Sequence, residues 1–484
     1  MPEQDTAQGA VERLEIAYTA KPVSGWGGLV ALVRYLDRLH VRELLRAVLP
    51  DGRSSPNQVP VVDIVLALWV AVLTGGRRFA HVERMRADEV VRGILGIRRM
   101  PSATTLTRYL GGFLHGQVAR LIEALRRFVI ARLAPPSLGW VLDLDSTVFE
   151  RYGTQEGSLK GHNPRKHGRP SHHPLLAMLA EAKIVLHAWL RSGNAGTARG
   201  VEAFLAETLA LLPSDFRLYA LRADSGFFIK SFLDELERRE LPYAIVARVT
   251  PQLRDAIVAV REWKPFAVGL EVAELQYEAP SWNKARRIVV VREEIRERPD
   301  ARGRKLFDIP GYTFHAVVTS LGLPAAEAWR FYNHRADCEN RLKELKDDFG
   351  ANGFCLQSFE GTEAVFQLIC FLFNLVALFK REVTGNDKPM LSTLRTDVFV
   401  VGAILGKDGR ASVLRLGLTG KWRDGFEDLL TRVARVVGST AAQLTNYAND
   451  HSVCPPLPWR ARRKRPPWPG FLRARAPTPM RMNA

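Results

Sequence analysis

The sequence predicts an α/β protein of several domains, with a helical part first and a β-rich stretch between two α/β segments. Three observations support this prediction. The chain has 484 residues, too many for one hydrophobic core, and its 46% apolar fraction is typical of a globular protein. Apolar residues recur at three- and four-residue spacing up to about residue 135. After Pro135-Pro136, short apolar runs alternate with turn residues and helical patterns.

The charge of the chain points to a polyanionic partner. A formal net charge of +18 and a pI near 10 favour nucleic acid. An anionic membrane surface would require an amphipathic anchor or a lipidation signal, and the sequence shows neither. The N-terminus, MPEQDTAQ, does not resemble a secretory signal, so we expect a cytoplasmic, nucleoid-associated protein. The four cysteines lack metal-ligand or disulfide spacing and are expected to be reduced thiols: Cys338, Cys355, Cys370 and Cys454.

Residues 1–135 are expected to form a helical domain that binds DNA. Its helices are interrupted at Pro50 to Pro60, Gly75-Gly76 and Pro101. Ser102 is suited to be the N-cap of a short helix over 103–113. This helix could be a recognition helix in the major groove, or a capped surface helix that packs inside the domain. Its outward polar residues are expected to be Thr104, Thr105, Thr107 and Arg108.

The next two regions contain most of the predicted strands. Residues 136–250 are expected to contain a helix over 228–239 and strands at 140–145, 184–191, 217–224 and 243–249. Residues 251–323 are expected to be a β-rich insertion, with strands inside 270–318 that include 287–291 and 312–319.

The helical pattern returns over 324–385, and 386–484 form a C-terminal region with a basic tail. The apolar run 364–379 is broken by Gln367 and Asn374 and is shorter than the roughly 20 residues of a spanning helix, which predicts a buried core helix. A hairpin over 396–418, around 407–409, and a helix over 425–444 are expected next. The proline-rich tail from Arg460 could contact phosphates or only aid solubility.

The segment WRFYNHRADCENRLKELKDDFG, residues 329–350, contains an unusual polar stripe. On a helical wheel, four residues fall within roughly 60° of arc: Tyr332, Arg335, Glu339 and Lys346. In isolation, Arg335 and Glu339 would be a helical salt bridge that contributes about 0.2–0.5 kcal/mol. The stripe borders the apolar face of the helix, where charge is costly unless a cavity or ligand is near. The pattern therefore favours a functional site.

Acids also stand on two apolar strands. In Val141-Leu-Asp-Leu-Asp-Ser-Thr147, strand alternation puts Asp143 and Asp145 on one side, where they would need a cation. The alternative is that one acid caps a turn and the other lies at an edge. Asp224 ends an apolar strand and precedes a glycine turn, which is where open α/β sheets place their sites. A helix N-cap is the alternative for Asp224.

Taken together, these motifs resemble the DDE transposases of bacterial insertion sequences. The resemblance lies in Tyr332-x2-Arg335-x3-Glu339-x6-Lys346, in the D-S-T strand at Asp145 and in the D-S-G-F turn at Asp224. It is narrower for the group with the Y-R-E-K signature and extends from about Trp140 to Arg381. It implies a ribonuclease-H-like catalytic core, made of 136–250 and 324–385 and interrupted by the β-rich insertion.

The resemblance also implies roles for single residues. Asp145, Asp224 and Glu339 would be the catalytic metal ligands, and an all-oxygen set suits two Mg²⁺ ions, with Mn²⁺ as a substitute. The residues expected to bind DNA phosphates are Tyr332, Arg335, Lys346 and Arg248. Two roles stay open: Asp143 could be an auxiliary ligand, and Trp282 could stack on a displaced base or be a core tryptophan.

The expected enzyme is a cut-and-paste DNA transposase that cleaves transposon ends and transfers strands into target DNA. Its partners would be double-stranded DNA, namely terminal inverted repeats and target, and a second copy of the chain when two ends are paired. Two alternatives remain: a catalytically silent, transposase-derived DNA-binding protein, and a structure-specific nuclease on the ribonuclease-H fold. Such a nuclease would cleave branched DNA without strand transfer.

Overall fold

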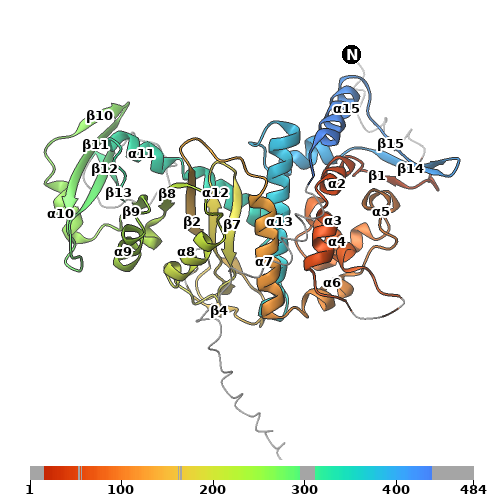
Figure 1. Cartoon of the computed structure of the whole chain (residues 1–484), viewed down its shortest axis with the longest axis horizontal. Helices are drawn as coiled ribbons and strands as arrows, with labels where there is room; N and C mark the ends of the chain where they lie inside the picture. The colour runs from red at the N-terminus through yellow and green to blue at the C-terminus, as the bar shows by residue number, and fades with distance from the viewer. Residues whose placement is uncertain are drawn as a thin grey trace, which may run out of the picture. The chain divides into compact units, whose positions relative to one another are not determined.

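The structure is a mixed α/β fold, as predicted, and its largest element is a β-sheet (Figure 1). The computed structural model describes residues 16–438 except 53–54, 56, 162, 164–165 and 295–310. Within these residues the sheet has nine strands in the order β10-β11-β12-β13-β9-β8-β2-β6-β7. In chain order they are β2 (Trp140–Ser146), β6 (Leu175–Leu179), β7 (Ile184–Trp189), β8 (Leu218–Ala223), β9 (Tyr243–Val246), β10 (Lys264–Ala267), β11 (Leu270–Tyr277), β12 (Arg286–Glu294) and β13 (Tyr312–Thr319).

Three neighbouring strands run parallel and end at the same edge of the sheet. Strand β2 is parallel to β8, and β8 is parallel to β9. The strands predicted at 140–145, 184–191, 217–224 and 243–249 are therefore confirmed, with small shifts at their ends. The helix predicted over 228–239 is confirmed as α9 (Lys230–Arg238). Strand β6 and helix α8 (Val201–Ala210) are among the elements that were not predicted.

The predicted β-rich stretch continues the same sheet. Strands β10 to β13 pair antiparallel in sequence, and β13 pairs antiparallel with β9 over Val317 to Thr319. The helix α11 (Ala325–Asn333) contacts β11, β12 and β13, and its Ala328 is wholly buried. A short helix, α10 (Pro251–Val258), comes before these strands and is capped by Thr250, whose hydroxyl accepts from the Leu253 amide.

The apolar helix predicted over 364–379 is a core helix, α13 (Phe359–Phe379), and it covers the end strand β7. The two polar residues that interrupt its sequence bond to the backbone of that strand. Asn374 accepts from the Val185 amide and donates to the Val185 carbonyl, and Gln367 donates to the Ala188 carbonyl. The segment Phe359–Thr384 is long and apolar enough to cross a membrane, but its most apolar window is entirely buried in the fold. Gln367 and Asn374 thus satisfy a sheet edge that would otherwise be open.

Helices dominate the structure before β2. They are α2 (Leu29–Arg38), α3 (Val41–Val48), α4 (Val61–Leu73), α5 (Glu89–Leu95), α6 (Ala103–Leu110) and α7 (His115–Ile130), with a 3₁₀ helix η1 (Phe79–Met85). Helix α13 packs against α2, α4, α6 and α7. Ser102 caps α6 as predicted, because its hydroxyl accepts from the Thr105 amide. Helix α6 ends at Leu110, three residues earlier than expected, and it buries Leu106 and Leu110.

The C-terminal region differs in part from the prediction. The hairpin around 407–409 is confirmed as β14 (Ala403–Asp408) and β15 (Ala411–Leu416), but 391–399 is helical and not extended. Strand β14 also pairs with β1 (Val23–Ser24). Helix α15 (Gly420–Arg435) begins five residues earlier than expected. The tail from Arg460 and Cys454 lie outside the described residues; the other three cysteines are free thiols.

Candidate active site

Asp145 and Asp224 stand side by side at the ends of two parallel strands. In the register of β2 and β8, Leu144 is opposite Ala223, so the next residues along are Asp145 and Asp224. Adjacent strands are about 4.8 Å apart. The Asp145 side chain is mostly buried, and burial raises its pKa to about 6. The negative charges of Asp224 and Glu339 also raise this pKa, whereas Arg335 lowers it. Both other predicted acids therefore lie close enough to act on Asp145.

Arg335 joins two of these acids. Its Nη2 lies 2.8 Å from Asp145 Oδ2, and its Nη1 donates to Glu339 Oε1 at 2.7 Å. Burial lowers the pKa of Arg335, but the neighbouring acidic groups, Asp145 first, together outweigh burial, and the pKa lies above its ordinary value. The predicted helical salt bridge between Arg335 and Glu339 is thus present. The same guanidinium also binds Asp145, so the two acids share one arginine.

Asp224 has the turn-capping role that the sequence left open. Its Oδ1 accepts from the Gly226 amide at 2.8 Å, which caps the 3₁₀ helix η2 (Ser225–Phe227). A side chain on Gly226 would collide with Thr197, so this turn requires glycine. The cap engages one carboxylate oxygen of Asp224. The predicted metal binding by Asp224 is therefore compatible with the cap.

Asp143 is compensated by a residue that the sequence did not single out. Arg222 lies opposite Asp143 in the register of β8, and its Nε and Nη2 donate to the two carboxylate oxygens at 2.7 and 2.8 Å. Burial raises the pKa of Asp143, and the hydrogen bonds from Arg222 oppose this. The cation that the two-acid strand demanded is therefore an arginine at this position, and it engages both oxygens of the proposed auxiliary ligand.

The continuous helix expected over 329–350 is wrong, because the chain turns at His334. Helix α11 ends at Asn333, α12 (Ala336–Lys343) follows, and Glu344–Asp348 form a π-helical turn, η3. At the break, the Arg335 amide bonds the Tyr332 carbonyl, while the Phe331 carbonyl accepts from Arg222 Nη1 at 2.8 Å. Arg222 thus takes the acceptor that a continuous helix would have used.

The break distributes the polar stripe over three elements. Tyr332 is on α11, Glu339 is on α12, and Lys346 is on η3. The pKa of Tyr332 is raised to about 12, first by burial and also by the charges of all three predicted acids, so the phenol lies near them. The pKa of Glu150 is lowered, first by a hydrogen bond from Lys166 and also by the charge of Lys346. Lys346 therefore lies near Glu150 of β3 (Phe149–Glu150).

A buried cluster supports the π-helical turn. Glu344, which is 1% exposed, accepts from Arg341 Nη1 at 2.6 Å and from the Leu391 amide at 2.7 Å. Lys380 Nζ donates to Glu344 Oε1 at 3.4 Å and to the Pro389 carbonyl at 2.9 Å. These bonds anchor the turn two residues before Lys346, a detail that the helical wheel did not indicate.

The two remaining sequence candidates have different settings. Arg248 Nη2 donates to the Ser225 carbonyl at 3.3 Å, beside the turn that Asp224 caps. Trp282 packs edge-on against Phe228 and Tyr277, and the guanidinium of Arg286 lies 4.7 Å from its ring centre. These contacts are typical of a packed tryptophan.

Sequence reasoning also missed a hydrogen-bonded chain beside Asp145. Ser146 Oγ donates to Thr197 Oγ1 at 3.3 Å and lies 3.2 Å from His173 Nε2. The Asp145 carboxylate accepts from the Ser146 amide at 2.7 Å. Buried Arg191 binds the carbonyls of Gly196 and Thr197 and so fixes this loop. The D-S-T motif was the only signal in the sequence that pointed to this support.

No three His, Cys, Asp or Glu side chains in the described part of the chain lie close enough together to hold one metal ion. Two of the predicted ligands are instead held by the Arg335 guanidinium. The donor set still fits a hard divalent cation, because its atoms are carboxylate oxygens that already bind a cation.

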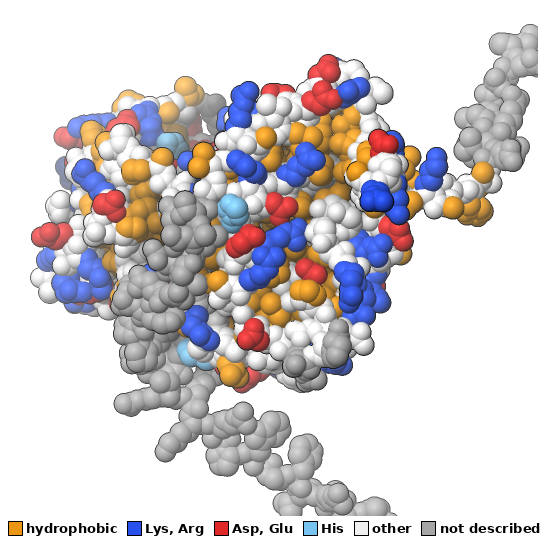
Figure 2. Space-filling view, turned by 45° about the vertical axis from the view of Figure 1, so that its right-hand side comes forward, with side chains coloured by type: hydrophobic (Ala, Val, Ile, Leu, Met, Phe, Trp, Pro, Cys, Tyr) orange, Lys and Arg blue, Asp and Glu red, His pale blue; other side chains and the backbone are white. Residues whose placement is uncertain are grey.

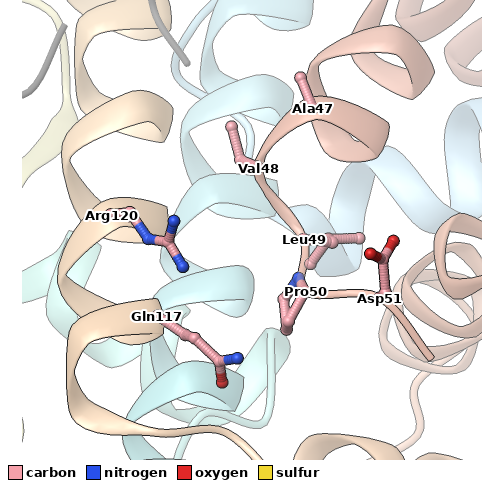
Figure 3. A pocket seen from close by; sticks show the side chains of 7 residues that line it. All are labelled: Ala47, Val48, Leu49, Pro50, Asp51, Gln117 and Arg120. Atoms are coloured by element: carbon pink, nitrogen blue, oxygen red, sulfur yellow. The ribbon is translucent and has the colours of Figure 1, made fainter. Parts of the chain in front are cut away.

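Two cavities lie apart from this network. One, of about 440 Å³, lies where the end of α3 faces α7, as Figure 3 shows; it is lined by Ala47, Val48, Leu49, Pro50, Asp51, Gln117 and Arg120. The other, of about 790 Å³, reaches Asp143 and Arg222 and is lined mainly by apolar atoms of the sheet and of α11 and α12. Neither cavity is lined by Asp145, Asp224 or Glu339.

Comparison with known families decides the assignment. A family model described as transposase DDE domain group 1 matches residues 7–437. The chain belongs to this family of DDE transposases. Its match covers the helices before β2, the sheet and the C-terminal hairpin, and therefore extends beyond the stretch that the motifs alone suggested. No curated protein matches the sequence.

Among solved structures, seven chains match the transposase. One is the cryo-EM structure of a piggyBac transposase synaptic complex with hairpin DNA, which is 10% identical, with a TM-score of 0.43 over 89% of this chain and 87% of that chain.

Proposed function

We propose that this DNA transposase cleaves and rejoins DNA at a site formed by Asp145, Asp224 and Glu339 on a ribonuclease-H-like core. One observation carries the proposal. Acids that lie far apart in the chain converge: Asp145 and Asp224 are next to each other on parallel strands, and Glu339 reaches the guanidinium that also holds Asp145. The carboxyl ends of strands are where open α/β sheets place their binding sites.

The carboxylate set suits Mg²⁺, with Mn²⁺ as a substitute, and two bound ions would activate the attacking oxygen and stabilise the leaving oxygen of a phosphodiester. The protein positions the rest. Arg335 and Lys346 bind phosphate oxygens, Arg335 through a planar fork that can contact two oxygens at once. Arg248 stands beside the Asp224 turn for the same purpose. Tyr332, whose phenol stays protonated at neutral pH, packs against the phosphate or donates to it.

The substrate is double-stranded DNA, first the terminal inverted repeats and then the target, in a cut-and-paste reaction by a homodimer. The formal charge of +18 supports this partner. Lys and Arg side chains occur across the face shown in Figure 2, with acids between them. We assign residues 1–135 to DNA binding, 136–250 with 324–385 to the catalytic core, 251–323 to the insertion and 386–484 to a C-terminal region. The exposed Thr104 and Arg108 of α6 are available for a groove contact.

The test is cleavage of a supercoiled plasmid that carries the inverted repeats found beside the gene, in Mg²⁺, with a synthetic four-way junction as a second substrate. D145N, D224N and E339Q should each abolish cleavage and retain binding to the end DNA. D337N is the matched control, because Asp337 is an exposed acid on the same helix as Glu339. Cleavage by any of the three variants would refute the assignment of that residue. Junction cleavage without strand transfer would favour the structure-specific nuclease.

A further inference from the structure

Both oxygens of Asp145 are already engaged. Oδ1 accepts from the Ser146 amide at 2.7 Å, and Oδ2 lies 2.8 Å from Arg335 Nη2. The same guanidinium takes Oε1 of Glu339. A divalent cation can therefore bind between these two carboxylates only when Arg335 leaves its position. Either the cation itself or another ligand must displace Arg335.

Arg335 is held less completely than its neighbour Arg222. Arg222 makes a two-pronged contact with Asp143, and its third nitrogen donates to the Phe331 carbonyl. Arg335 makes one contact with each of two acids and a longer one, 3.3 Å, to the Leu144 carbonyl. Its Nε is buried and has no hydrogen-bond partner among the described residues. Arg335 also stands at the break between α11 and α12, where the backbone is not part of a continuous helix.

We propose that Arg335 is an exchangeable counter-ion that couples metal binding to DNA binding; this rests on the proposed carboxylate site. Without DNA, the guanidinium bridges Asp145 and Glu339 and keeps divalent cations weakly bound. A DNA phosphate offers the same guanidinium two anionic oxygens in a planar arrangement, which is a strong charge-assisted contact. When the phosphate binds Arg335, the two carboxylates become available together.

This exchange has a thermodynamic consequence. If DNA raises the affinity for metal by some factor, metal must raise the affinity for DNA by the same factor. Couplings of this kind are typically about 5- to 150-fold. The transposase would then assemble its metal site mainly on DNA, which limits cleavage chemistry on the free protein.

The experiment measures Mn²⁺ binding to the full chain by the electron paramagnetic resonance signal of free Mn²⁺. Four proteins are compared without DNA: wild type, R335Q, R335K and R330Q. R335Q should bind Mn²⁺ about 5- to 150-fold more tightly than wild type. R335K keeps the charge but cannot fork between two acids, and should be intermediate. R330Q removes an exposed cation from α11 and controls for general electrostatics, so its affinity should stay within about twofold of wild type.

A second arm adds a duplex that contains the element end. With the duplex bound, the affinity of the wild type for Mn²⁺ should rise by a certain factor, and Mn²⁺ should raise its affinity for the duplex by the same factor. This comparison uses the wild type alone and so does not depend on the folding of a variant. R335Q should lose that dependence. Equal Mn²⁺ affinity of the wild type with and without bound duplex, or Mn²⁺ binding by folded R335Q no tighter than that of the wild type, would overturn the exchange.

Failure of the proposed function has a different signature. The triple variant D145N/D224N/E339Q should lose the Mn²⁺ binding seen for wild type with the duplex. If that variant binds Mn²⁺ as the wild type does, the carboxylate site itself is wrong. If binding depends on the three acids but not on Arg335, only the counter-ion exchange is wrong.

Discussion

Asp143 and Asp145 lie two residues apart on the same face of β2, yet their surroundings differ. Asp143 is 1% exposed and is closed by the two-pronged contact with Arg222. Asp145 is 8% exposed, shares Arg335 with Glu339, and stands beside Asp224 at the strand end. The first arrangement completes a charge pair inside the fold. The second leaves more negative than positive charge in one place, which is what a cation site needs.

The comparison teaches how the acid that we propose as a metal ligand differs from a structural acid on the same strand. Arg222 also fixes the Phe331 carbonyl and thereby the break before α12, so the closed pair shapes the helix that carries Glu339. The position of this helix lets Glu339 share Arg335 with Asp145. Burial alone does not distinguish the two residues, because it raises the pKa of both. The number of acids that share one arginine does distinguish them: among the described acids, Arg222 pairs with Asp143 alone, whereas Arg335 pairs with both Asp145 and Glu339.

The largest expected effect separates the two acids by activity. D145N should lower cleavage of end DNA at least about a thousandfold, which corresponds to about 4 kcal/mol of transition-state stabilisation. D143N should retain cleavage within about tenfold per folded molecule, because Asp143 is engaged by Arg222. Rates are measured with protein whose folded fraction is determined by circular dichroism. Equal losses in both variants would remove the distinction between the two acids.

The same two variants should also differ in stability, but here D143N should be the more strongly affected. D143N leaves Arg222 buried without its partner, and breaking a buried pair typically costs about 3–5 kcal/mol. The double variant D143N/R222Q should recover part of this loss, since no unpaired charge remains. The free energy of unfolding from urea titration checks both values. A D143N loss below about 1 kcal/mol would show that the pair does not support the fold.

The pH dependence sharpens the comparison at Asp145. Because burial raises its pKa from 3.8 to about 6, the folded protein binds this proton more tightly than the unfolded chain. The resulting stabilisation is fully present below about pH 4 and is lost as the pH rises to about 6, with a size of up to about 3 kcal/mol. D145N should lack this part of the pH dependence of unfolding. An identical pH profile in the wild type and D145N would contradict the raised pKa.

The smallest expected effect concerns a residue proposed to contact DNA and not the acids. K346M should weaken binding of end DNA by about tenfold, or about 1.4 kcal/mol, and reduce the salt dependence of binding by about one phosphate contact. Mn²⁺ binding without DNA should not change. Fluorescence anisotropy over a salt series measures both quantities. An unchanged salt slope would place Lys346 outside the phosphate contacts.

The sequence anticipated the strands that bear the acids and missed what lies between them. Alternation on β2 placed Asp143 and Asp145 on one face, and the strand-end position of Asp224 was visible as an apolar run followed by a glycine turn. The helical wheel could not foresee the break at His334, because the break depends on Arg222 of a distant strand. For the same reason, the separate partners of Asp143 and Asp145 could not be assigned from local spacing.

The fold showed a similar limit. The apolar helix over 364–379 could be recognised as a core helix from Gln367 and Asn374, but only the structure shows that both residues bond to β7. Strand β6 was missed because its residues, Leu175 to Leu179, are apolar throughout and show no alternation. Such a strand is buried on both faces and cannot be told from a helical segment by its pattern.

The most direct test of the central claim replaces one proposed ligand by a softer one. A thiolate binds Mn²⁺ better than Mg²⁺, so D224C should lose cleavage in Mg²⁺ and regain measurable cleavage in Mn²⁺. Asp224 is chosen because the only hydrogen bond of its side chain in the described structure is the cap to the Gly226 amide. Loss of that cap would lower cleavage in Mg²⁺ and in Mn²⁺ alike. Cleavage by D224C in Mg²⁺ within about tenfold of the wild-type rate would contradict a metal-binding role for this acid.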